Sequence, residues 1–169
     1  MRERDVFYMN RALSLAWRAM EEGDVPVGAV LLAGEEIIGE GWNRGRILND
    51  PTSHAEMMAI RMAASRIGNY RLSGATLYVT LEPCFMCFGA MLESRISRLV
   101  FGAREPRRGV LGSLYDLQND PRLYHKITVV SGLLEGESGR LLQDFFQKKR
   151  EGEPKNPGTG FLPSPSLGD

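Results

Sequence analysis

The chain has 169 residues, and its 21 basic and 21 acidic side chains give a formal net charge of zero. This balance excludes a generally polybasic nucleic-acid binder, although a local basic patch on a neutral body stays compatible with it. The length suits one globular domain with its own core, and only two cysteines exclude a disulfide-built scaffold.

The first part of the chain predicts a helix, a hairpin and a second helix. From 5 to 22 apolar residues recur at helical spacing, and Gly23 follows as a stop signal. Two β-type stretches, 27–33 and 36–43, flank Gly34 and Glu35, which predict a tight turn between them. Cap-type residues at 50–53 then precede a helical pattern that ends near Gly68.

The second part predicts three strands and two helices. The expected strands are 76–81, 99–101 and 127–130, with a Gly- and Arg-rich connection from 102 to about 119. Pro83 would open a helix that runs through Met91 and Leu92, because a first-turn proline loses no hydrogen bond there. The last helix would cover about 138–150, with four apolar residues turned inward. These are Leu141, Leu142, Phe145 and Phe146.

The domain organisation follows from composition. Strands that alternate with helices favour βαβ units, so we expect an α/β fold in three layers, opened by the antiparallel hairpin. Residues 151–169 hold four prolines and four glycines, and we expect them to be a disordered tail behind a domain of residues 1–150. The N-terminus mixes both charge signs and no apolar run reaches the roughly 18 residues of a membrane helix. We therefore expect a cytoplasmic protein without membrane contact.

Both cysteines stand one helical turn apart in Pro83-Cys84-Phe85-Met86-Cys87. At that spacing two thiolates can share one metal, and a helix N-terminus favours the thiolate form. His54 offers a third ligand, and three protein ligands with one open position are typical of a catalytic zinc ion, not a structural one. His125 would complete a closed site only if its distant segment folded back.

Glu56 follows His54 by two residues, so the two side chains would not face each other in mid-helix. At a first turn that points end-on at the metal, His54 can bind zinc while Glu56 reaches the water and the substrate as a proton carrier. His-x-Glu followed by Pro-Cys-x-x-Cys is the signature of zinc-dependent nucleobase deaminases. A thioredoxin-like redox site would account for the two cysteines, but it would not need the upstream His-x-Glu, so this alternative is disfavoured.

Five further segments make the sequence similar to the bacterial tRNA-specific adenosine deaminases over about residues 5–150. They are 24–30, 39–44, 50–56, 77–84 and 101–104. The resemblance implies a cytidine deaminase-like fold with a mixed five-stranded sheet flanked by helices. It also implies a homodimer with one Zn²⁺ per chain, which converts the wobble adenosine of a tRNA anticodon stem-loop to inosine.

The resemblance also implies residue roles. His54, Cys84 and Cys87 would bind zinc, and Glu56 would move protons. Asn43 would hydrogen-bond the purine edge, although such a residue is also a common turn former. The other substrate contacts it implies are Arg104, Glu105 and Phe146.

Two positions depart from the family pattern. Glu105 stands where aspartate is usual, which lengthens an acid expected near the ribose of a flanking nucleotide. Phe88 replaces a small residue after the second cysteine, and it would either thicken the core behind the zinc or constrict the pocket floor.

Two basic clusters suit phosphate contact, although a basic helix end can also be a solvated face. They are Arg104, Arg107 and Arg108, and Lys148, Lys149 and Arg150. Two other functions stay open on the sequence. One is a deaminase of free guanine, cytosine or cytidine, because a zinc site alone does not choose a base. The other is a zinc-stabilised RNA-binding module without catalysis, which would have no use for Glu56.

Overall fold

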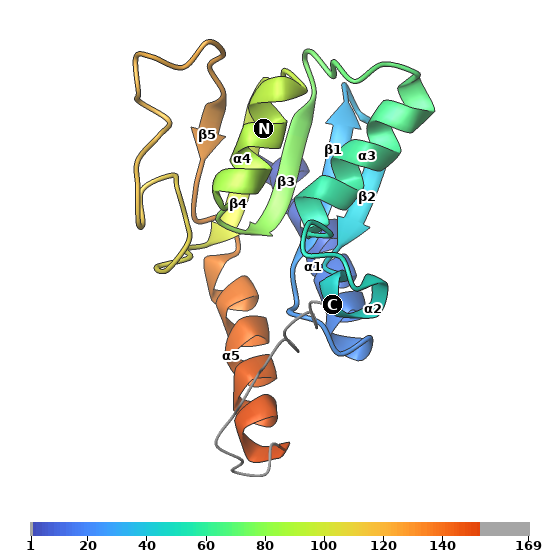
Figure 1. Ribbon diagram of the computed structural model, residues 1–169, viewed down its shortest axis with the longest axis vertical. Helices are drawn as coiled ribbons and strands as arrows, with labels where there is room; N and C mark the ends of the chain where they lie inside the picture. Colours follow the sequence, from blue (N-terminus) through green and yellow to red (C-terminus); the bar gives the residue numbers. More distant parts are fainter. Residues whose placement is uncertain (1, 153–169) are drawn as a thin grey trace, which may run out of the picture.

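A five-stranded mixed sheet with the strand order β2-β1-β3-β4-β5 forms the middle layer of the molecule (Figure 1). The computed structural model describes residues 2–152. Its elements are α1 (Arg2–Glu21), β1 (Gly28–Ala33), β2 (Glu36–Trp42), α2 (Gly45–Leu48), α3 (Ala55–Ile67), β3 (Thr76–Leu81), α4 (Phe85–Glu93), β4 (Arg98–Ala103), β5 (Thr128–Val130) and α5 (Glu135–Gly152). The expected α/β class with a mixed five-stranded sheet is confirmed.

One strand of the sheet, β1, runs opposite to the other four. β1 pairs antiparallel with β2 and with β3, whereas β3, β4 and β5 run parallel. The β3 side chains are buried on both faces, because Leu77 and Val79 join one core cluster while Tyr78 joins the other. Helices α3 and α4 cover the first face and α1 covers the second, which gives three layers.

Helix α3 packs directly on β2 because glycines replace side chains at the contact. A Cβ added at Gly41 would lie 2.2 Å from the Ala55 carbonyl oxygen, and one added at Gly39 would lie 2.2 Å from that of Ala59. No side chain fits between backbones so close together. The first turn of α3 is therefore fixed against the end of β2.

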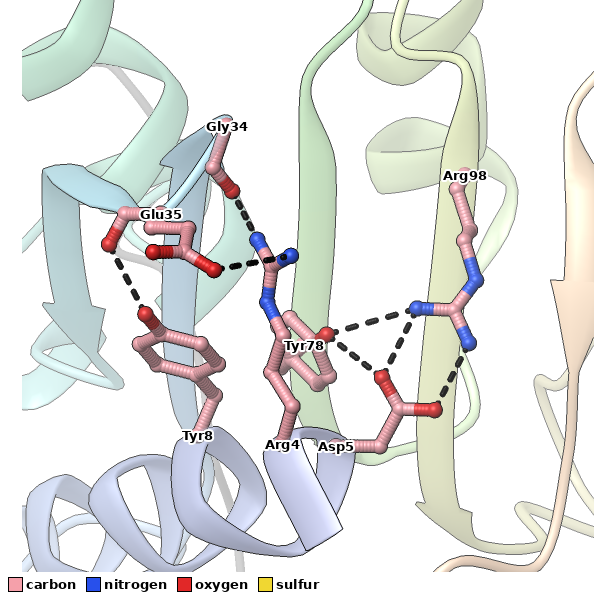
Figure 2. Close-up of polar contacts among 7 residues, drawn as sticks. All are labelled: Arg4, Asp5, Tyr8, Gly34, Glu35, Tyr78 and Arg98. Carbon is pink, nitrogen blue, oxygen red and sulfur yellow. Dashed lines mark hydrogen bonds and ion pairs between the residues drawn. The ribbon is translucent and has the colours of Figure 1, made fainter. Parts of the chain in front are cut away.

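A buried ion pair ties the start of α1 to the sheet (Figure 2). The Arg98 guanidinium donates to both carboxylate oxygens of Asp5 at 2.9 and 2.8 Å, and the Tyr78 hydroxyl donates to Asp5 at 2.7 Å. The hydrogen bond from Arg98 lowers the pKa of Asp5. Burial, together with the hydrogen bond to Asp5, raises the pKa of Tyr78 to about 12.

Several predicted boundaries were wrong by a few residues. The cap-type residues 50–53 do not cap α3: His54 is its N-cap, and Asp50 instead accepts hydrogen bonds from Thr52 and Ser53. Pro83 precedes the N-cap of α4 and is not in its first turn. The short helix α2 was not expected, since only four residues form it.

The C-terminal helix is longer than predicted. It begins at Glu135 and continues through Glu151 and Gly152, so it passes the expected domain limit at residue 150. Leu141 is buried as expected, but Phe146 is 45% exposed, so the inward orientation predicted for it was wrong. The rest of the expected tail, 153–169, lies outside the described residues. None of the helices within residues 2–152 is long and apolar enough to cross a membrane.

Candidate active site

Two helix N-termini meet at one end of the sheet and bring the predicted metal ligands together. His54 is the N-cap of α3 and Cys84 is the N-cap of α4, while Cys87 lies in the first turn of α4. The Nδ1 atom of His54 is 3.7 Å from the Cys84 Sγ and 3.5 Å from the Cys87 Sγ. The His54 side chain makes no capping hydrogen bond to α3, and its ring faces the two sulfur atoms instead.

The donor set fits a zinc ion. The ligand atoms of His54, Cys84 and Cys87 lie within 4.8 Å of one another, and they form the one such cluster found among residues 2–152. Zinc prefers imidazole nitrogen and thiolate sulfur, which are the donors present here. His125 does not complete the set, because its Nε2 lies 2.6 Å from the Ile96 carbonyl oxygen. Three protein ligands leave one coordination position for a water or a substrate atom.

The thiols are also electrostatically prepared for a cation. The hydrogen bond from Cys87 and the one shared with His54 lower the pKa of Cys84 to about 3, against the opposing effect of burial. The same bond to Cys84 and its own burial raise the pKa of Cys87. The site without metal therefore holds one thiolate beside one thiol, and a bound divalent cation would displace the second proton.

Glu56 occupies the second position of α3 and is 4% exposed. Its Oε2 atom is buried without a hydrogen-bond partner among the described residues. Burial raises the pKa of this carboxyl to about 6. A buried carboxyl group that has one oxygen without a hydrogen-bond partner and a pKa of about 6 suits proton transfer better than metal binding.

A small cleft opens beside these groups. Its apolar walls come from Val25, Val27 and Leu81, and His54, Glu56 and Cys84 line its metal-binding side. Asn43 also lines the cleft, and its Oδ1 accepts a hydrogen bond of 2.8 Å from the Ala55 N–H.

The bond from Ala55 fixes the orientation of the Asn43 carboxamide. With Oδ1 occupied, its N–H donors are left for the cleft. Asn43 therefore helps to seat the first turn of α3 and can also contact a bound base.

The other predicted substrate contacts are spread over the surface next to this cleft. Glu105 lines it together with Arg108, whereas Phe146 lines a neighbouring groove with Arg107 and Arg150. Arg104 is not brought to either surface, because its guanidinium donates to the Leu111 carbonyl oxygen at 3.0 Å.

The Phe88 departure is resolved by the packing. The ring is buried in the core cluster beneath α4 and is absent from the cleft lining. It therefore thickens the core and leaves the pocket floor unchanged.

One lining residue, Glu82, had no part in the sequence-based interpretation. It is 2% exposed and follows β3 directly. The available signal was an acid placed straight after a buried strand, where the carboxyl ends of parallel strands gather functional groups.

Known proteins match the chain in sequence and in structure. The family model for the cytidine and deoxycytidylate deaminase zinc-binding region matches residues 2–103. A tRNA-specific adenosine deaminase of Haemophilus influenzae is 51% identical over 150 residues, which cover 88% of this chain and 87% of that protein.

Two solved structures are similar to this chain in fold. One, from a study of A-to-I editing by tRNA:A34 deaminases at the wobble position, has a TM-score of 0.78 at 46% identity and covers 80% of this chain and 99% of its own. A guanine deaminase of Nitrosomonas europaea has a TM-score of 0.68 at 24% identity and covers 81% of both chains. At that identity the second likeness concerns the fold alone.

Proposed function

This chain belongs to the family of tRNA-specific adenosine deaminases, and we propose that it hydrolyses adenosine to inosine at the wobble position of a tRNA anticodon. The observation that carries the proposal is the meeting of three zinc-type ligands with the buried carboxyl of Glu56, whose Oε2 has no hydrogen-bond partner among the described residues. A structural metal site would have no use for such a group. This argues against the RNA-binding module without catalysis.

The reaction needs a nucleophile and several proton transfers. Zinc held by His54, Cys84 and Cys87 would lower the pKa of water from 15.7 to roughly 7, so that hydroxide is available at neutral pH. Glu56 would accept a proton from the attacking water as the oxygen bonds to C6 of adenine, and would pass this proton to N1. The same carboxyl would then accept the proton of the new C6 hydroxyl and pass it to the amine as the C6–N bond breaks, so that adenosine and water become inosine and ammonia.

Asn43 is proposed to select the base. Its carboxamide is held by the Ala55 N–H, which leaves donors for an acceptor on the purine edge. Glu105 and Arg108 line the same cleft and would contact the sugar and phosphate next to the target. These assignments extend the roles that the family resemblance implies.

The surface beyond the cleft supports an RNA substrate. Arg107, Arg108 and Arg150 line one groove with the exposed ring of Phe146, so positive charge and an aromatic face occur together. Such a pairing suits single-stranded nucleic acid, whose phosphates and unstacked bases bind charge and rings respectively. A loop base can enter the cleft more cheaply than a duplex base, because less stacking is lost.

The alternative substrate is a free base or nucleoside. Comparing inosine formation from an anticodon stem-loop carrying adenosine at the wobble position with turnover of free adenosine, guanine and cytidine separates the two. We expect the stem-loop to react far faster, because contacts away from the reacting atoms can raise turnover as well as binding. Faster reaction of free guanine or cytidine would contradict the tRNA substrate, and the protein would then be a zinc-dependent deaminase of a free base or nucleoside.

We also propose that the protein acts in the cytoplasm as a homodimer. Support for the dimer comes from an apolar groove lined by Trp42, Met58 and Met62, where Met62 is 51% exposed. Apolar grooves of this kind are typical of self-association. Sedimentation would show a two-chain mass for the native protein, and Met62→Glu would shift it toward one chain. A one-chain mass for the native protein would contradict the dimer.

A further inference from the structure

Glu82 is a buried carboxylate whose partners all belong to one distant segment. Oε1 accepts hydrogen bonds from the backbone N–H groups of Leu111 at 2.9 Å and Ser113 at 3.1 Å. Oε2 accepts one from the Glu105 N–H at 3.1 Å and one from the Ser113 hydroxyl. All four donors are neutral groups, so the carboxylate acts as an anchor for backbone and not as half of an ion pair.

The anchored segment carries substrate-facing side chains. Residues 104–127 connect β4 to β5 without helix or strand, apart from one isolated bridge between Leu111 and Asp116. A connection of this length inside a compact domain needs contacts from elsewhere to hold one conformation. Glu105 and Arg108 are on it, and both line the catalytic cleft.

The chain makes room for this anchor at Gly109. A Cβ added there would lie 2.4 Å from the Glu82 Cδ and 2.6 Å from the Glu105 carbonyl oxygen. Beside it, the Val110 N–H donates to the Pro83 carbonyl oxygen at 3.1 Å, so the segment is bound to both residues that precede Cys84. The connection and the metal-binding helix are thereby joined through one short stretch of chain.

We propose that Glu82 is a positioning residue that holds the segment 105–113 in its substrate-binding conformation. The inference rests on the proposed function and deepens it, since it assigns part of the substrate affinity to an acid that does not need to touch RNA. Glu56 and the metal ligands are on α3 and α4, not on this segment. Loosening the segment should therefore weaken substrate binding and leave the chemical step largely intact.

Glu82→Gln is the most selective test, because it keeps the shape and removes one acceptor. The new amide can still accept from Leu111 and Ser113, and the Ser113 hydroxyl can rotate. The Glu105 N–H then faces an N–H₂ group and loses its acceptor. We expect the KM for the stem-loop to rise about tenfold with kcat within about twofold of native, at unchanged zinc content. Glu3→Gln, at an exposed position on α1, is the matched control and should leave both constants unchanged.

Backbone amide exchange gives a readout that needs no activity. In the native protein, the N–H groups of Glu105, Leu111 and Ser113 should exchange slowly. The Arg107 N–H should exchange faster, because it donates to the Glu105 side chain in an exposed hydrogen bond. In Glu82→Gln the Glu105 N–H should lose most of its protection. Gly109→Ala, which pushes against the carboxylate, should change the KM in the same direction.

Three outcomes would overturn the proposal. The first is an unchanged KM in Glu82→Gln. The second is loss of zinc and of kcat with an unchanged KM, which would mean that Glu82 supports the metal-binding helix α4 and not the segment 105–113. The third is fast exchange of the Leu111 and Ser113 N–H groups in the native protein. This measurement tests the anchor even if Glu82→Gln fails to fold. If the native protein deaminates no stem-loop, the proposed function fails, and amide exchange still tests the anchor.

Discussion

The two cysteines of the candidate metal site differ in exposure and in proton affinity. Cys84 is partly exposed at the N-cap of α4, and its pKa of about 3 keeps it a thiolate. Cys87 is fully buried behind it and retains its proton until a cation arrives. Binding of a divalent cation by both sulfur atoms would therefore release a proton from Cys87.

Replacing Cys87 should therefore abolish metal retention. In Cys87→Ser the thiolate becomes a hydroxyl that stays protonated near neutral pH and binds zinc poorly. We expect less than one zinc per ten chains by elemental analysis after dialysis, against about one per chain for the native protein. Met86→Leu, at the neighbouring position of α4, is the control and should keep its zinc. Stoichiometric zinc in Cys87→Ser would contradict the ligand assignment.

At the scale of elements, the position of α3 depends on a contact between backbones. Because Gly41 faces the first residue of α3, an added methyl group pushes on the turn that carries His54 and Glu56. Gly41→Ala should lower the free energy of unfolding by about 1–3 kcal/mol, measured by urea denaturation.

A glycine of helix α5, unlike Gly41 of strand β2, should stabilise the protein when it is replaced by alanine. Nothing lies within 4 Å of a Cβ added at Gly139 in α5, so Gly139→Ala should raise the free energy of unfolding by about 0.5–1 kcal/mol. Equal effects of the two substitutions would contradict the packing argument.

The ion pair at the start of α1 gives a prediction about pH. Arg98 lowers the folded-state pKa of Asp5, so its stabilisation is present above the unfolded value of about 3.9 and is lost as the pH falls through the lowered value. Asp5→Asn should cost about 1.5–3 kcal/mol of unfolding free energy at pH 7.

The difference in unfolding free energy between Asp5→Asn and the native protein should shrink between pH 7 and an acid pH at which Asp5 is protonated, because the pKa of Asp5 is lowered in the folded state. Urea denaturation at both pH values checks this. A difference that does not change with pH would mean that Asp5 acts only through packing.

The sequence predicted elements with strong local signals and missed those that depend on distant contacts. Strand 76–81 was predicted at its observed limits, because its β-branched and aromatic residues are buried on both sides. The starts of α3 and α4 were misplaced, since the cap-type residues before α3 form a local turn instead. The role of Glu82 was not visible, because its partners lie more than twenty positions along the chain.

For the molecule as a whole, a net charge of zero means that the proposed RNA substrate would be held by local clusters of positive charge. We expect the affinity for the stem-loop to fall with salt, and the slope of log affinity against log salt to flatten by roughly 0.7 per lost phosphate contact. The variant to compare neutralises the four groove-side cations to glutamine. These are Arg107, Arg108, Lys149 and Arg150.

The control variant neutralises Arg71 and Lys126. These exposed residues precede β3 and β5, at the end of the sheet away from the cleft. The control variant should keep the native slope. If the four-residue variant also keeps it, the basic groove takes no part in binding RNA.

We propose that a zinc ion and the Glu56 carboxyl together deaminate a wobble adenosine. The most direct test is inosine formation in the stem-loop by zinc-loaded native protein and by zinc-loaded Glu56→Ala. We expect conversion by the native protein, and a rate lower by about 10⁴-fold or more in the variant at unchanged zinc content, because one group serves several proton transfers. Native-like conversion by Glu56→Ala with its zinc in place would contradict it.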